Sequence, residues 1–115
     1  MTERRVLVIG SQCQALQELP FLPRAAQELY AVMTDPERGA CVSAIEDEGL
    51  LLDPSVEKAK DAIKTAYRRA ARDEAVLFLA YIGHGEYADN DYYLLPRDAQ
   101  NPPTSDTALH LTNVG

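Results

Sequence analysis

The chain has 115 residues, enough for one domain that buries about 65% of the surface exposed by its unfolded form. Its net charge of −7 and its scattered basic residues disfavour nucleic-acid binding. No stretch approaches the ~18 apolar residues of a membrane span, and the amino-terminal apolar run is too short for a signal peptide, so we expect a cytoplasmic protein without membrane contact. Two cysteines without Cys-x-x-Cys spacing provide neither a disulfide framework nor a zinc motif.

The amino-terminal part predicts a strand, a loop and a helix. Val6–Ile9 is a compact apolar run ended by Gly10, as in a buried parallel strand. Residues 11–22 are read as a loop, and Pro23 suits the first turn of a helix. Four apolar residues at helical spacing are expected to face the sheet: Ala26, Leu29, Tyr30 and Met33. Asp35-Pro36 is expected to end this helix.

The middle of the chain predicts a loop, a short strand and a long helix. Residues 37–49 have no clear period and are read mostly as loop, and Leu50–Leu52 is a short strand candidate. Asp53-Pro54-Ser55 is a helix start with a capping side chain. One narrow apolar stripe follows over four turns, formed by Val56, Ala59, Ile63, Ala66 and Ala70.

The third strand is the most informative stretch. Ala75–Ile82 is an unbroken apolar run, typical of a parallel strand buried on both faces, and it leads into Gly83-His84-Gly85. Residues 86–91 are read as an acidic turn, and Tyr92–Pro96 as a short strand hairpinned back toward the histidine. Residues 109–115 are expected to begin another element.

This order predicts an α/β fold with three αβα layers and a mostly parallel sheet in a single domain, residues 1–115. If the first and third strands are neighbours, their carboxyl ends lie side by side, where open α/β sheets bind ligands. The loop after Gly10 would then border His84.

His84 is the histidine with a suggestive position. An imidazole gains and loses a proton near neutral pH, so His84 is a candidate general base. The Gly85 N–H could donate to an oxyanion formed beside it. The alternative is structural, since a histidine between glycines can simply bond a nearby carbonyl at the end of a strand.

Gly83-His84-Gly85 after an apolar strand, followed by Tyr93-Leu94-Leu95-Pro96 and Asp98, resembles the caspase-like cysteine peptidases, especially the bacterial and metacaspase-like members of peptidase type C14. The resemblance spans nearly the whole chain. Two positions depart from the family pattern: Ile82 stands where Ser is usual, and residues 24–27 replace a common Asn-Asp.

The resemblance implies a truncated caspase-like fold and a hydrolase that cleaves peptide bonds through a His-Cys dyad. His84 and Gly85 are the implied catalytic residues. The family's cysteine lies about 50 residues after the histidine, near position ~134, beyond Gly115. The chain alone is therefore expected to be inactive.

The resemblance also implies that the loop starting at Ser11, Gln12 and Cys13 lines the pocket for the residue before the cleaved bond. Glu86, with Asp89 and Asp91, would favour a basic residue there, although these acids also suit a solvated turn. Neither a cofactor nor a metal is expected, because one histidine and turn acids make no ligand set and the glycine-rich dinucleotide turn is absent.

Two further hypotheses remain open. Cys13 could itself be a nucleophile beside His84, although a free cysteine is more often a small buried hydrophobe. Alternatively, the chain could be a non-catalytic interaction module of the same fold. The expected partners are a protein or peptide substrate and the remainder of the peptidase domain or a second chain. A homo-oligomer is also possible, because an uncovered apolar strand edge would otherwise promote aggregation.

Overall fold

The structure is a computed structural model that describes residues 2–46, 48–88, 90–104 and 107–110. It contains two helices, α1 (Leu22–Thr34) and α2 (Val56–Asp73). Its strands are β1 (Arg4–Ser11), β2 (Val42–Ser43), β3 (Leu50–Leu52), β4 (Val76–Gly83), β5 (Gly85–Ala88), β6 (Asp91–Leu94) and β7 (Leu109–His110). Both helices, the first three predicted strands and the hairpin lie where the sequence predicts them.

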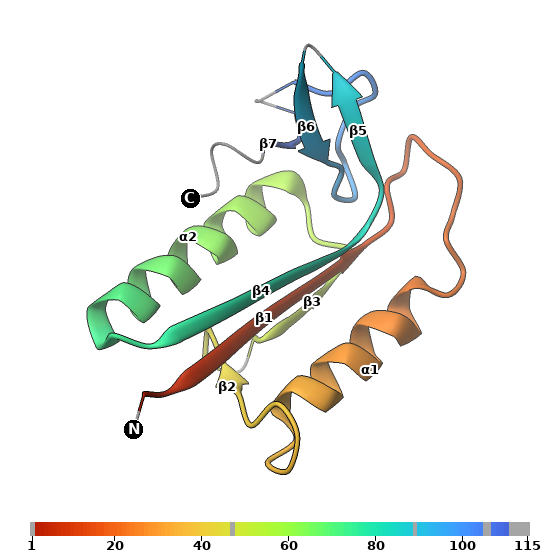
Figure 1. Ribbon diagram of the computed structural model, residues 1–115. Coiled ribbons are helices and arrows are strands. Elements are labelled where there is room, and N and C mark those ends of the chain that lie inside the picture. The colour runs from red at the N-terminus through yellow and green to blue at the C-terminus, as the bar shows by residue number, and fades with distance from the viewer. Residues whose placement is uncertain (1, 47, 89, 105–106, 111–115) are drawn as a thin grey trace.

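The larger sheet is parallel and centred on β1 (Figure 1). One side of β1 pairs with β2 near its start and with β3 near its end. The other side pairs with β4 along its whole length, in a register running from Arg4↔Val76 to Ser11↔Gly83. The first and third predicted strands are therefore neighbours, which meets the condition under which their carboxyl ends lie side by side. A separate antiparallel sheet has the order β5-β6-β7 and continues from the carboxyl end of β4.

One helix covers each face of the parallel sheet, because alternate residues of β1 point to opposite faces. Leu7 and Ile9 belong to a buried cluster with the small-residue stripe of α2, which includes Ala59, Ala62, Ile63 and Ala66. Val6 and Val8 pack with Ala26 of α1 in a second cluster. The predicted three-layer α/β architecture is thus present around β1.

The start of α2 is capped from two directions. The Lys58 N–H donates to Ser55 Oγ at 3.1 Å, which confirms the predicted cap. The Val56 N–H donates to Asp98 Oδ1 at 2.7 Å, so an acid far along the chain satisfies a second free donor of the helix. In this structure Asp98, part of the motif quoted above, holds α2 in place.

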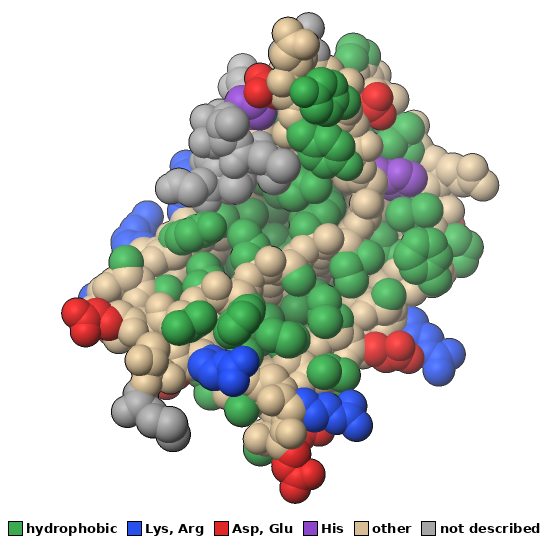
Figure 2. All heavy atoms as spheres, viewed as in Figure 1, with side chains coloured by type: hydrophobic (Ala, Val, Ile, Leu, Met, Phe, Trp, Pro, Cys, Tyr) green, Lys and Arg blue, Asp and Glu red, His purple; other side chains and the backbone are tan. Residues whose placement is uncertain are grey.

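The prediction that β4 is buried on both faces is wrong for the described part of the chain. Val76 is 44% exposed, and Phe78 and Leu79 are each 37% exposed. The reason is that β4 is an edge strand: among the described residues it pairs with β1 alone. Figure 2 shows hydrophobic side chains gathered over this edge, between the two helices.

Two short strands differ from the predicted pattern. β2 interrupts the predicted loop over residues 37–49, and β5 replaces much of the predicted turn over residues 86–91. β7 confirms an element starting at Leu109, and residues 111–115 lie outside the described residues. No helix in the described ranges is long and apolar enough to cross a membrane.

Candidate functional site

His84 lies at the point where the chain passes from the parallel sheet to the antiparallel hairpin. It follows β4 directly and precedes β5, and the end of β4 is paired with the end of β1 at Ser11↔Gly83. The loop after β1 therefore starts beside the histidine, as the sequence predicts. This is the edge of an α/β sheet at which ligands commonly bind.

The imidazole of His84 is half-buried and is held by the loop after β1. Its Nε2 lies 2.8 Å from the backbone carbonyl oxygen of Gln17. A carbonyl oxygen only accepts, so Nε2 carries the proton and donates it. In the neutral ring the lone pair is then on Nδ1, which makes Nδ1 the nitrogen able to accept a proton.

The backbone N–H of Gly85 is directed away from the hairpin. His84 O accepts a hydrogen bond from Leu95 N at 3.0 Å, and the next pair in the ladder is Gly85↔Leu94. Hydrogen-bonded and non-hydrogen-bonded pairs alternate in antiparallel sheets, so Gly85↔Leu94 is a non-hydrogen-bonded pair. The Gly85 N–H consequently points to the outer edge of β5, where it can donate to another group.

Both glycines beside His84 are required by close contacts. A Cβ on Gly83 would lie 2.5 Å from the carbonyl oxygen of Ser11, so this strand end could not approach β1 with a larger residue. A Cβ on Gly85 would collide with the hydroxyl of Tyr92, which lies across the backbone at that point. Glycine therefore permits a close approach of the chain on both sides of the histidine.

Gln12 closes the loop that reaches His84. Its side-chain Nε2 donates to Leu19 O at 2.7 Å, and its Oε1 accepts from Leu19 N at 2.8 Å. Its backbone N–H also donates to Asp53 Oδ1 at 2.8 Å, which ties the loop to the end of β3. Gln12 was predicted to line a substrate pocket; in the structure its side chain turns inward to its own loop.

Ser11 and Cys13, the other predicted pocket residues in this loop, are buried. The Ser11 hydroxyl donates to Gln12 O at 2.8 Å. Cys13 is 2% exposed, its thiol lies 3.5 Å from Ala99 O, and it packs in a cluster that includes Leu95. The structure thus brings the Cys13 loop to His84 but forms no hydrogen bond between these two side chains.

The acidic residues after His84 do not act as one group. Glu86 is exposed on β5, one residue beyond Gly85. Asp91 Oδ2 lies 3.1 Å from Nε2 of His110, so this carboxylate has a partner within the hairpin sheet. Asp89 lies outside the described residues. Glu86 is therefore the acid that remains beside the predicted catalytic pair with an exposed side chain.

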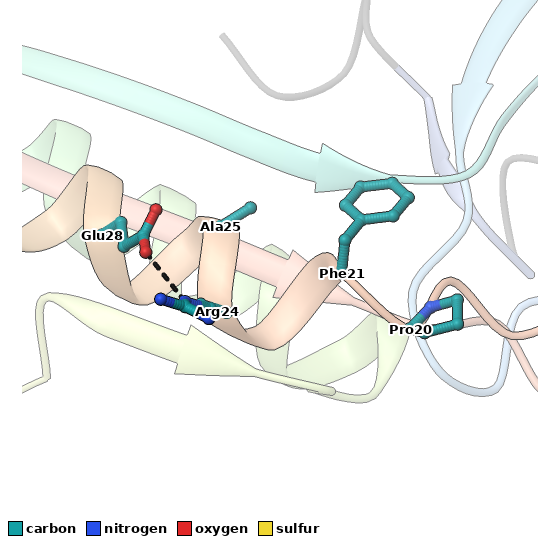
Figure 3. A pocket seen from close by; sticks show the side chains of 5 residues that line it. All are labelled: Pro20, Phe21, Arg24, Ala25 and Glu28. Carbon is teal, nitrogen blue, oxygen red and sulfur yellow. Dashed lines mark hydrogen bonds and ion pairs between the residues drawn. The ribbon is translucent and has the colours of Figure 1, made fainter.

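An open depression of about 610 Å³ lies at the start of α1 (Figure 3). Pro20, Phe21 and Ala25 provide apolar lining, and the Phe21 ring is 61% exposed. Arg24 also lines it, and its Nε donates to Glu28 Oε1 at 2.9 Å. The depression begins three residues after Gln17, so it adjoins the loop that contacts His84.

Sequence reasoning did not identify Gln17 or Tyr92 as part of this site. Gln17 acts through its backbone carbonyl, which every residue type has, so no side-chain pattern could reveal it. Tyr92 was read only as a strand residue, although an aromatic residue near a strand glycine is a known pairing in sheets.

No group of three or more His, Cys, Asp or Glu residues suited to hold a metal ion occurs within residues 2–46, 48–88, 90–104 and 107–110. A comparison with protein-family models found no match for the chain, and a comparison with curated proteins found none either.

Proposed function

We propose that His84 is the general base of a caspase-like cysteine endopeptidase whose nucleophilic cysteine is carried by a strand downstream of residue 115. The observation that carries this proposal is the place of His84 at the carboxyl end of β4, beside the end of β1. The 2.8 Å hydrogen bond from His84 Nε2 to Gln17 O is a contact that the structural alternative also predicts, and it fixes which ring nitrogen carries the proton. It leaves Nδ1 as the basic nitrogen at the carboxyl end of a parallel strand. A base fixed by a second group in this way is the common arrangement for activating a thiol.

The free edge of β4 supports the second half of the proposal. A parallel strand that pairs there would run beside β4 and end next to His84, because carboxyl ends of parallel strands meet at one edge of a sheet. It would also cover Val76, Phe78 and Leu79, the exposed apolar residues of β4. One added strand therefore both buries this edge and brings a side chain to the histidine.

Formation of the thioester would proceed by two proton transfers at Nδ1, and its hydrolysis by two more. Nδ1 takes the thiol proton while the sulfur attacks the scissile carbonyl carbon, and the imidazolium remains bonded to Gln17 O. The Gly85 N–H and the N–H of the cysteine hold the resulting oxyanion. Nδ1 then protonates the leaving amine as the C–N bond breaks. In the second half of the reaction Nδ1 takes a proton from the water that attacks the thioester carbonyl, and it returns this proton to the sulfur as the C–S bond breaks and the acid is released. Glu86, exposed beside Gly85, favours a substrate with Arg or Lys before the cleaved bond.

The proposal is tested with this 115-residue chain and a longer polypeptide that extends through the next strand. Both are incubated with peptides bearing Arg, Lys or Asp before the cleavable bond. We expect turnover by the longer polypeptide alone, with Arg or Lys preferred. His84→Ala should abolish turnover, whereas the control His110→Ala should retain it because His110 lies on β7, outside the proposed site. Equal turnover in His84→Ala would overturn the assignment.

The exposed edge of β4 also favours a second candidate, a non-catalytic interaction module that binds an extended strand of a partner or a second copy. Edge strands with no charge or proline readily pair with another chain, and β4 has neither. Phe78→Lys should then abolish association measured by light scattering, while Lys64→Ala on the exposed side of α2 should not. The coding sequence beyond Gly115 separates the candidates: an Asp-Ala-Cys-like motif favours the peptidase, and a stop codon favours the module.

A further inference from the structure

We infer that Gln12 is a positioning residue that holds the Gln17 carbonyl against His84 and so fixes which imidazole nitrogen is basic. The inference rests on the proposed function in calling His84 a base, but the geometry it describes belongs to this chain alone. The Gln12 hydrogen bonds go to Leu19 and Asp53 rather than to His84, so Gln12 acts through the loop between β1 and α1.

The Gln12 side-chain amide closes the loop by two hydrogen bonds to the backbone of one residue, as a paired residue does in a β-sheet. Its amide both donates to and accepts from the backbone of Leu19, at 2.7 and 2.8 Å, across seven residues of chain. The backbone N–H of Gln12 is fixed in turn by Asp53 Oδ1 at 2.8 Å. One side chain therefore links the end of the parallel sheet to the residue just before α1.

Gln17 lies inside the segment that this contact closes. Its carbonyl meets His84 Nε2 at 2.8 Å, near the optimum for such a bond. A carbonyl displaced by about 1 Å would no longer accept this proton well, since hydrogen bonds weaken steeply with distance and angle. The ring would then be free to rotate or to exchange its protonated nitrogen, and a misplaced base can cost about a hundredfold in rate.

The environment of Gln12 favours a role in positioning the loop over a role in contacting substrate. Gln12 is half-buried with both amide atoms engaged, whereas a residue that recognises substrate keeps polar atoms available. The neighbouring Gln14 is exposed in the same loop and uses its backbone N–H to bond Arg97 O at 2.9 Å. Gln14 therefore provides a matched control of identical chemistry two residues away.

The test is nuclear magnetic resonance on the 115-residue chain, which has only two histidines. The readouts are the Nε2–H signal of His84, its ring ¹⁵N shifts and the hydrogen exchange of the Leu19 amide. In Gln12→Met, which keeps a long side chain without hydrogen bonds, we expect the His84 Nε2–H signal to be lost and Leu19 exchange to rise about tenfold. Gln12→Ala should do the same, and Gln14→Ala should change neither.

Two internal references exclude general unfolding. The His110 ring is paired with Asp91 in the hairpin sheet and should keep its signal in every variant. The amides of Val6 and Val8 in the central strand should remain protected. The positioning role is refuted if Gln12→Met keeps the Nε2–H signal and the ring ¹⁵N shifts of His84 unchanged while the Leu19 amide exchanges faster. That result would show that the contact between Gln12 and Leu19 exists but does not position His84. Peptidase activity of the longer polypeptide is measured separately, so failure of this inference and failure of the proposed function are distinguishable.

Discussion

Replacing Tyr81 by phenylalanine should stabilise the protein, although it removes a polar group from the interior. Tyr81 lies on β4 and packs against the cluster beneath α2. Its hydroxyl is buried and makes no well-formed hydrogen bond among the described residues, although the Ser11 hydroxyl lies close enough to interact with it. An unsatisfied buried polar group costs about 1–3 kcal/mol, so Tyr81→Phe should raise the free energy of unfolding at pH 7 by about 1 kcal/mol or more.

The same residue should make the protein sensitive to alkaline pH. Burial raises the pKa of Tyr81 well above its ordinary value of 10.0; the neighbouring Cys13 thiol adds a smaller rise, and the nearby Ser11 hydroxyl partly opposes it. The unfolded chain then releases this proton at a lower pH than the folded one. The free energy of unfolding is therefore unaffected by this group below pH 10.0. As the pH rises from 10.0 towards the folded-state pKa of Tyr81, the free energy of unfolding falls by about 1.4 kcal/mol per pH unit.

Urea unfolding at pH 7, 10 and 11, followed by circular dichroism, measures both effects. The stability advantage of Tyr81→Phe should be about 1 kcal/mol greater at pH 11 than at pH 7. Tyr67→Phe is the matched control, because Tyr67 is 43% exposed on α2 and should show no such increase. A Tyr81→Phe variant that is less stable than the parent at pH 7 would mean that the hydroxyl has a partner in solution, and the reasoning would fail.

Three other predictions concern the core, the helix cap and the surface ion pairs. Leu7→Ala should lower the free energy of unfolding by about 3 kcal/mol in urea, since Leu7 lies on β1 and is fully buried in the cluster beneath α2. Asp98→Ala should cost about 1 kcal/mol, because the Val56 N–H at the start of α2 loses its acceptor, and Ser55→Ala gives the reference value for a cap. Hydrogen bonds from Arg72 and Arg5 hold the pKa of Asp73 well below its ordinary value. Asp73→Asn should therefore be less stable than the parent by a constant amount near neutral pH, and this difference in stability should disappear progressively as the pH falls below about 4. Unfolding of both proteins measured over a series of acidic pH values checks this.

The fold could be predicted from the sequence wherever one element buries one face. The stripe from Val56 to Ala70 and the run Val6–Ile9 each indicate their element unambiguously, and both are found buried. The two-residue strand β2 could not be predicted, because its pairing with Arg5 and Val6 depends on a backbone contact rather than on a side-chain pattern. The same limit applies to β5, whose turn-rich residues form a strand only because the hairpin brings them opposite β6.

Only those parts of the candidate site that depend on side-chain type could be predicted from the sequence. The position of His84 at the end of a strand follows from the apolar run before it. Its place beside the loop after β1 follows only once the first and third strands are neighbours, as the structure shows. Its contact with Gln17 does not, because a backbone carbonyl leaves no trace in the sequence. Gln12 and Cys13 were assigned to a pocket because they lie in that loop, yet the loop turns both inward. The sequence thus locates the loop, whereas hydrogen bonding within the loop decides which atoms are exposed.

The direction in which a further strand pairs with β4 distinguishes the two proposed functions. A parallel strand would end beside His84 and could deliver a cysteine to Nδ1. A second copy related by two-fold symmetry would pair its β4 antiparallel, which brings the Val76 end of one strand toward the His84 end of the other. Both arrangements bury the exposed side chains of Phe78 and Leu79, so burial alone does not separate them. The decisive observation is which residue lies next to His84, and a cross-link from that position to the pairing strand would identify it.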